Sequence, residues 1–232
     1  MLLIVNPDTP KEMLTTLKGL GHHVSFSLSF PSGILSHPDQ QIHMLNDTTA
    51  ITAPAYYSYY RKLLPKHISL LCGDKNPTGT YPEDCAYNVA RINTYVFCNT
   101  NAAEPKILAY YTNSGYHICH VNQGYAKCNM TILGNDCILT EDKGIHNFII
   151  ANKLKIHSVL LPVGEISLSG FPYGFIGGSG GGMGDFYFWY GDIRRCSYYE
   201  IIKEQTEERG IENISLATEP LCDFGGIICV PL

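Results

Sequence analysis

The sequence lacks any cluster of lysine and arginine residues. Its 232 residues include 16 Lys and Arg and 21 Asp and Glu, which gives a formal net charge of −5, and no block of like charges occurs along the chain. Nucleic acids and anionic membranes attract proteins through clustered basic side chains. We therefore expect neither a nucleic acid nor a membrane surface as a partner.

Long hydrophobic runs are also missing. No apolar stretch approaches the roughly 20 residues that span a bilayer, and the first ten residues, MLLIVNPDTP, lack the charged start and the long apolar run of a signal peptide. The composition, 45% hydrophobic and 16% charged, is ordinary for a folded globular protein. We expect a single cytoplasmic domain over residues 1–232, and its sixteen tyrosines leave a homodimer through exposed edge strands open.

The pattern Cys-x-x-Cys does not occur, although the chain has nine cysteines. They lie singly in predicted strands and loops, so reduced thiols are expected. His117 and His120 lie near Cys119 and Cys128, yet their spacing matches no recognised zinc motif. The sequence therefore predicts neither a metal site nor a cofactor.

What the sequence does contain is a strand–helix–strand pattern that recurs five times. In the first copy, residues 2–30, Asp8 or Thr9 is predicted to cap a helix that has Pro10 in its first turn and Gly21 after its end. The predicted helix starts lie near residues 10, 54, 105, 143 and 195. Repeats of this length are typical of one supersecondary unit each.

Tight turns are predicted between an extra strand and the first strand of each following unit. They lie at Asn46, Asn93, Gly134 and Gly184, between apolar or β-branched segments, and Asn and Gly tolerate the positive φ of hairpin turns. Each unit then has two strands around a helix and one inward hairpin strand. Five such units in a ring predict an α/β fold, a five-bladed α/β propeller with the sheets inside and the helices outside.

The segment GFIGGSGGGMGDFYFW, Gly174 to Trp189, has six glycines in the eight residues from Gly177 to Gly184. No Gly-Lys-Ser or Gly-Lys-Thr follows, and an aromatic strand does, which excludes a phosphate-binding loop. The glycines are predicted to let a hairpin backbone approach a ligand or the propeller axis. A flexible hairpin without a site is the alternative.

The five units and the C-terminal sequence DFGGIICVPL together resemble the guanidino-group-modifying enzymes, also called penteins. Gly225, Gly226 and Cys229 form the most specific part of this likeness, and GYAKCN and YGFIGGSGG resemble an uncharacterised branch with the same fold. The resemblance implies the pentein fold, with pseudo-five-fold repeats along nearly the whole chain. The superfamily includes arginine deiminases, dimethylarginine dimethylaminohydrolases, agmatine deiminases, amidinotransferases and proteins that only bind.

The resemblance also implies a nucleophile. In penteins a cysteine on the final inner strand attacks the guanidinium carbon, a histidine acts as acid and base, and carboxylates hold the guanidinium nitrogens. Cys229 falls on the cysteine position, and a bound cation would favour its thiolate form. The alternative for Cys229 is a small buried residue of the last strand.

Other positions depart from the family's pattern. Where the family has Glu-Gly-Gly-Asp this chain reads AKCN, so Cys128 and Asn129 replace glycine and aspartate, and Asn88 takes the inner-strand place in EDCAYN. The inner strand of the family's histidine reads YGFIGGSG here and contains none. Without an acid for the departing amine, the reaction would lose on the order of 10² to 10⁴ in rate. His120 and His37 precede predicted inner strands and are the candidates to substitute.

Three hypotheses remain open. The first is a cysteine-dependent hydrolase or amidinotransferase that acts on a guanidino compound, with Cys229 and His120 as its catalytic residues. Its predicted substrate-binding residues are Asp84, Asn88, Cys128, Asn129, Gly177, Gly178 and Asp223. The second is a ligand-binding or scaffolding protein that has lost the catalytic histidine and carboxylates. The third is an enzyme whose axial amides recognise a neutral substrate, such as a peptide or sugar group.

Overall fold

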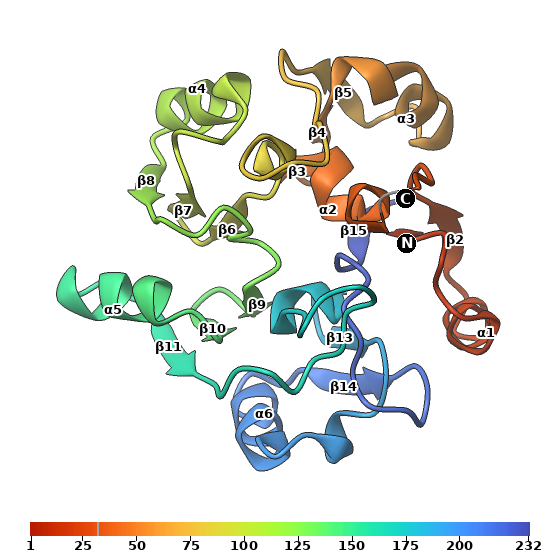
Figure 1. The fold of residues 1–232 in the computed structure, drawn as a ribbon, viewed down its shortest axis with the longest axis vertical. Coiled ribbons are helices and arrows are strands. Elements are labelled where there is room, and N and C mark those ends of the chain that lie inside the picture. Colours follow the sequence, from red (N-terminus) through yellow and green to blue (C-terminus); the bar gives the residue numbers. More distant parts are fainter. Residues whose placement is uncertain (32) are drawn as a thin grey trace.

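Five three-stranded sheets are arranged around a common centre in the computed structural model, which describes residues 1–31 and 33–232 (Figure 1). In every sheet the middle strand runs antiparallel to the inner strand and parallel to the outer strand. A helix connects each middle strand to its outer strand and lies on the outside of the ring. The predicted five-bladed α/β propeller with pseudo-five-fold repeats is confirmed.

The first blade contains both ends of the described chain. Its strands are β15 (Ile228–Val230), β1 (Leu2–Val5) and β2 (His23–Phe26), and its helix is α1 (Lys11–Gly19). Leu3 of β1 lies opposite Cys229 of β15, so the last strand completes the sheet that the first strand begins.

The other four blades are each formed by one continuous segment. Blade two has β3 (Ile42–Asn46), β4 (Thr49–Thr52), α3 (Tyr57–Leu63) and β5 (Ser69–Cys72), and blade three has β6 (Ala90–Ile92), β7 (Tyr95–Cys98), α4 (Pro105–Asn113) and β8 (His117–His120). Blade four has β9 (Met130–Leu133), β10 (Cys137–Thr140), α5 (Lys143–Ala151) and β11 (His157–Leu160). Blade five has β12 (Gly180–Met183), β13 (Phe186–Trp189), α6 (Tyr199–Glu207) and β14 (Glu212–Ser215).

The hairpin turns form where the sequence predicts them. Asn93, Gly134 and Gly184 have positive φ values of 51°, 59° and 66°. At the remaining turn, Asn46 Oδ1 accepts the Thr48 N–H at 2.8 Å. Local residue chemistry therefore determines these four connections.

Two helix boundaries differ from the prediction. The N-cap of α1 is Pro10, without a side-chain cap bond, because the preceding turn is held by Asn6 Oδ1, which accepts the Asp8 N–H at 2.9 Å. Asp192 caps a 3₁₀ turn, η5 (Ile193–Arg195), so the last helix α6 begins only at Tyr199.

The glycine-rich segment forms the inner hairpin of blade five. Its strand is β12, whereas the part expected as the inner strand, YGFIGGSG, mostly forms the loop and the 3₁₀ turn η4 (Ile176–Gly178) that precede it. A Cβ atom on Gly181 would lie 2.4 Å from the carbonyl oxygen of Ile227. The glycines therefore allow backbone to pack on backbone near the axis, as the composition of the segment predicts.

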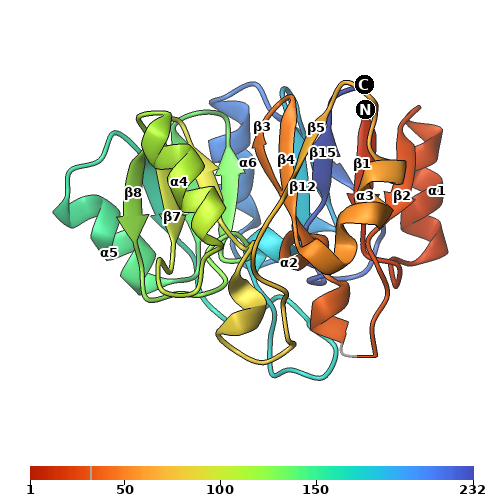
Figure 2. The same ribbon diagram turned by 90° about the horizontal axis from the view of Figure 1, so that it is seen from above.

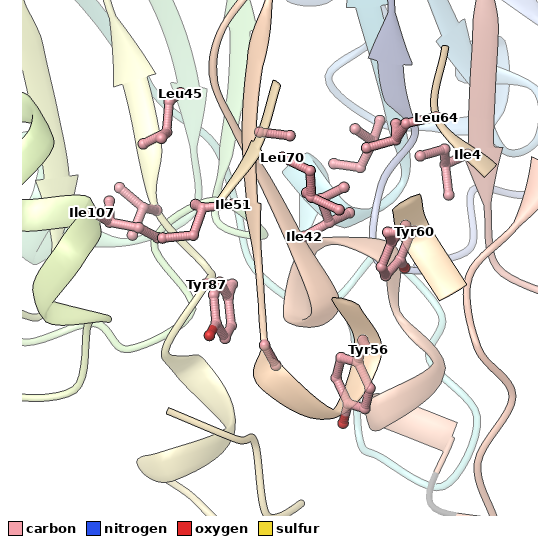
Figure 3. Close-up of a cluster of buried hydrophobic side chains, with 14 of the residues drawn as sticks. Ile4, Ile42, Leu45, Ile51, Tyr56, Tyr60, Leu64, Leu70, Tyr87 and Ile107 are labelled. Carbon is pink, nitrogen blue, oxygen red and sulfur yellow. The ribbon is translucent and has the colours of Figure 1, made fainter. Parts of the chain in front are cut away.

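Apolar side chains fill the spaces between neighbouring blades. The largest buried cluster joins the first three blades and includes Ile4 of β1, Ile42 of β3 and Ile107 of α4 (Figure 3). The cluster combines packing of helix against strand within a blade with packing between neighbouring blades. Within the described residues, no helix is both long enough and apolar enough to cross a membrane.

Candidate functional site

A short turn precedes each inner strand, and the side chains of these turns meet at one end of the ring. The turn before β3 is the short helix α2 (Pro38–Gln41), which lies at the opposite end of the strands from the two chain termini (Figure 2). Equivalent turns precede the other four inner strands. The polar residues that they bring together are His37, Asp39, Asn88, Cys128 and Asp223, and all five are buried.

Cys128 lies at the centre of this polar group. Its Sγ donates a hydrogen bond to Asp39 Oδ2 at 2.8 Å, and Asn88 Nδ2 donates to the same sulfur at 3.1 Å. Asn88 Oδ1 also accepts the backbone N–H groups of Lys127 and Cys128. The amide of Asn88 therefore fixes both the turn and the sulfur that it carries.

Asp223 and His37 form the other half of the group. His37 Nδ1 lies 3.9 Å from Asp223 Oδ1. The two carboxylate oxygens of Asp223 accept backbone N–H groups, Oδ2 from Phe175 at 2.9 Å and Oδ1 from Gly225 at 2.8 Å. Asp223 thus connects the turn before β15 to the segment before η4.

Burial controls the protonation of these groups. Burial raises the pKa of Asp39 to about 6, against the opposing effect of His37 and Lys127. Burial and the nearby carboxylates of Asp39 and Asp223 raise the pKa of the Cys128 thiol well above its usual value. At neutral pH Cys128 is therefore a thiol that donates to a carboxylate.

A cavity of about 550 Å³ lies between the inner strands. Asp39 and Lys127 line it from the turns that precede β3 and β9, and Arg91 of β6 and Cys229 of β15 line its side. The hairpin turns line its other end, with Asp47, Asn93, Gly134, Asn135, Gly184 and Asp185. The cavity is large enough for a small organic ligand.

Cys229 is half-buried and contributes to the cavity wall. Burial raises the pKa of its thiol to about 12, although the positive charge of Lys127 acts in the opposite direction. Among the described residues, no side chain makes a hydrogen bond to its sulfur. Cys229 is therefore protonated at neutral pH, without an adjacent base.

These features can be compared with known proteins. A family model matches residues 4–228. The chain belongs to the DUF6873 family, which is described as a family of unknown function. No curated protein matches the chain in sequence.

Several solved structures resemble this family member over almost its whole length. A mutant of the dimethylarginine dimethylaminohydrolase DDAH from Pseudomonas aeruginosa, complexed with citrulline, is 9% identical, with a TM-score of 0.58 over 94% of this chain and 92% of that one. The amidinotransferase SxtG of the saxitoxin biosynthetic pathway, from Microseira wollei, is 13% identical, with a TM-score of 0.55 over 97% and 88%. The inosamine-phosphate amidinotransferase from Streptomyces griseus is 14% identical, with a TM-score of 0.51 over 97% and 80%. These likenesses show that the DUF6873 chain has the pentein fold.

The structure groups some predicted site residues and separates others. Asn88, Cys128 and Asp223 lie together in the polar group, and Gly177 and Gly178 pack against it, since a Cβ atom on Gly178 would lie 2.0 Å from Asp223 Oδ1. Cys229 lines the cavity. These residues come from four different blades.

The prediction for His120 is corrected. His120 ends the outer strand β8, is exposed, and makes a 2.8 Å hydrogen bond through Nδ1 with Thr100 Oγ1. It does not line the cavity. An outer strand ends at the rim of the propeller, so its last side chain has no route to the axis.

Asp84 and Asn129 have local hydrogen-bonding partners. Asp84 accepts hydrogen bonds from Tyr125 Oη at 2.7 Å and from Cys85 Sγ at 3.3 Å. Asn129 Nδ2 donates to the carbonyl oxygen of Tyr125 at 3.3 Å. Both side chains hold the turns around Tyr125, and neither lines the cavity.

Two buried polar residues of the site were missed in the sequence. Asp39 lies in HPDQQ and resembles a helix-starting acid, and His43 lies in an apolar strand, IHML. His43 lines the cavity, and burial lowers its pKa to about 3. Its Nε2 lies 2.7 Å from Tyr111 Oη. The sequence signal that could have identified such residues is a polar side chain just before, or within, an apolar inner strand.

Proposed function

We propose that the axial cavity binds a small guanidino or amidino compound and that Cys229 attacks its central carbon, in a hydrolysis or an amidino transfer. The observation that carries this proposal is that one thiol, Cys229, and one buried carboxylate, Asp39, line the same cavity. The pentein fold supports it, because the structural neighbours include a dimethylarginine dimethylaminohydrolase and amidinotransferases.

Asp39 is the group that would receive the cation. Its Oδ1 atom is buried and has no hydrogen-bond partner among residues 1–31 and 33–232. A guanidinium group offers planar N–H donors that match a carboxylate oxygen and neutralise its charge. A ligand of this class would therefore remove the cost of leaving that oxygen unpaired.

The reaction begins from a protonated thiol. A cation next to the sulfur favours the thiolate, which offsets the burial that raises the Cys229 pKa to about 12. The thiolate forms a C–S bond to the amidine carbon, and the C–N bond to the leaving amine breaks as that amine takes the proton released by the thiol. Water, or an acceptor amine in a transfer, then attacks the same carbon and releases the thiol.

Binding without catalysis is the second candidate, and one observation favours it. The cavity histidine, His43, has a pKa lowered by burial to about 3 and already makes a hydrogen bond with Tyr111. It is therefore a neutral imidazole at neutral pH and lacks the acidic imidazolium proton that a departing amine would take. The protein would then bind the cation through Asp39 alone.

The test is incubation of the protein with arginine, agmatine and methylarginines, followed by an assay for ureido product and mass spectrometry of the protein. We expect product and a covalent adduct with the wild-type protein and neither with Cys229→Ala. Cys222→Ala is the matched control, because Cys222 is equally half-buried but does not line the cavity. We expect it to behave as wild type.

Calorimetric titration with the same compounds separates the two candidates. Asp39→Asn is expected to weaken binding by at least about tenfold, since a charge-assisted hydrogen bond is worth roughly 1.5–3 kcal/mol. Binding without product supports the second candidate. Neither binding nor product from any of the compounds would overturn both.

A further inference from the structure

Three buried side chains with metal-binding atoms meet beside the axial cavity. They are His37, Asp39 and Cys128, each at least nine-tenths buried. One ligand atom of each residue lies within 4.8 Å of the corresponding atoms of the other two. Asp39 and Cys128 are 89 residues apart in the sequence and come from the turns before β3 and β9.

Two atoms of this trio lack partners. His37 Nδ1 and Asp39 Oδ1 are buried and have no hydrogen-bond partner in the part of the chain that the structure describes. An unpaired buried polar group costs about 1–3 kcal/mol, and two such atoms at one place are unusual in a folded protein. A cation that accepts lone pairs from both would remove this cost.

The ligand types indicate which cation fits. A thiolate, an imidazole and a carboxylate are the three kinds of ligand that proteins use for Zn²⁺, at about 2.0–2.3 Å. Such bond lengths place tetrahedral ligand atoms roughly 3.3–3.8 Å apart. The three atoms lie within 4.8 Å of one another, so their separations would shorten by about 1.5 Å at most, while Cys128 Sγ and Asp39 Oδ2, now 2.8 Å apart, would separate slightly. A carboxylate and a thiolate together also balance the charge of a divalent ion.

We propose that His37 Nδ1, a carboxylate oxygen of Asp39 and Cys128 Sγ bind one zinc ion. The ion displaces the thiol proton, which is released to solvent, and takes the place that this proton holds between sulfur and carboxylate. The Nδ1 lone pair of His37 is available when the ring proton is on Nε2. Asp223, held by two backbone N–H groups, lies 3.9 Å from the same nitrogen, His37 Nδ1, and adds a negative charge on this side of the site.

This site does not depend on the proposed reaction at Cys229. Asp39 is common to both proposals, but Cys128 belongs only to the metal site and Cys229 only to the reaction. Substitutions at the two cysteines therefore separate the failure of one proposal from the failure of the other.

The experiment is titration of chelator-treated full-length protein with Co²⁺ and then with Zn²⁺. We expect one equivalent of Co²⁺ to produce a near-ultraviolet thiolate-to-cobalt band and visible bands of a four-coordinate ion, and Zn²⁺ to displace it. Cys128→Ser should lose the thiolate band and weaken Zn²⁺ binding by more than the roughly 10–100-fold that loss of an outer-shell partner costs. Cys229→Ala should bind both ions as the wild-type protein does.

The wild-type spectrum alone can refute the proposal if the Cys128→Ser variant does not fold. Failure to take up Co²⁺, or a cobalt spectrum without a thiolate band, would overturn it. So would loss of the band in Cys229→Ala together with its retention in Cys128→Ser, because the ion would then lie at the cavity thiol. His37→Gln, which keeps a polar side chain, is expected to weaken Zn²⁺ binding while retaining the thiolate band.

Discussion

At the scale of single residues, the polar group depends on two glycines, Gly174 and Gly178, whose lack of a side chain leaves room for the carboxylate of Asp223. Asp223 occupies the space that side chains on Gly174 and Gly178 would need, and a Cβ atom on Gly174 would lie 2.5 Å from the Asp223 Cβ. The backbone of these glycines therefore packs directly on the carboxylate. The glycine-rich segment is a structural support of the polar group as much as a strand of the propeller.

Gly178→Ala is expected to lower the free energy of unfolding by about 1–3 kcal/mol, because the new methyl group would overlap a buried carboxylate and force a backbone shift. Urea denaturation measures the change. Gly19→Ala is the matched control, since Gly19 has nothing within 4 Å of its added Cβ and lies at the end of α1. We expect it to be neutral or stabilising by up to about 1 kcal/mol, and equal losses in the two variants would contradict the argument.

At the scale of elements, neighbouring blades are joined by polar contacts near the axis as well as by apolar clusters. Glu141, which follows β10, accepts the Ile176 N–H of η4 through Oε2 at 2.8 Å. Burial raises the pKa of Glu141 to about 7, and this hydrogen bond acts in the opposite direction. The contact between blades four and five therefore contains a carboxyl group that titrates near neutral pH.

The folded protein is expected to lose stability through Glu141 as the pH rises. The folded pKa of about 7 lies above the unfolded value of 4.5, so the folded state binds more protons between these values. The free energy of unfolding then falls across that window, by up to about 3 kcal/mol in total. Urea denaturation from pH 4.5 to 7.5 should show wild type losing stability relative to Glu141→Gln. Glu12→Gln, at an exposed position of α1, should show no such pH-dependent difference.

At the scale of the whole molecule, the two ends of the described chain close the ring. Leu2, Leu3 and Ile4 of β1 pair with Val230, Cys229 and Ile228 of β15. Without β15 the first blade would lose its inner strand and expose an unpaired edge next to the cavity. The strand that holds the cavity thiol therefore also completes the fold.

Truncation after Ile227 is expected to abolish cooperative thermal unfolding or to leave the protein insoluble, because it removes the buried Ile228 and Val230 and their pairing with β1. Calorimetry and circular dichroism measure this effect. Removal of Leu232 alone, which is 64% exposed, should leave the melting temperature within about 1 °C of wild type. A truncated chain that still melts cooperatively would show that four blades are stable without closure.

The sequence by itself determined the features that depend on neighbours along the chain. Asn93, Gly134 and Gly184, which have positive φ, define three of the hairpin turns. Residues that start helices, such as Pro105, occur once in each blade-length segment of the chain. These features are local, so the number and order of the blades, and from them the propeller, could be predicted. The placement of Cys229 on the last inner strand came instead from the resemblance to the penteins, and the strand β15 contains it.

Only the tertiary structure decided which side chains meet. Asp39 and Cys128 make contact although 89 residues separate them, and His120 points to solvent although its strand precedes an inner turn. The contacts of the polar group arise from the rotation and packing of different blades around the axis, which no local pattern encodes. Burial shifts the pKa values of Asp39, His43, Cys128 and Cys229. It is likewise a property of the assembled ring.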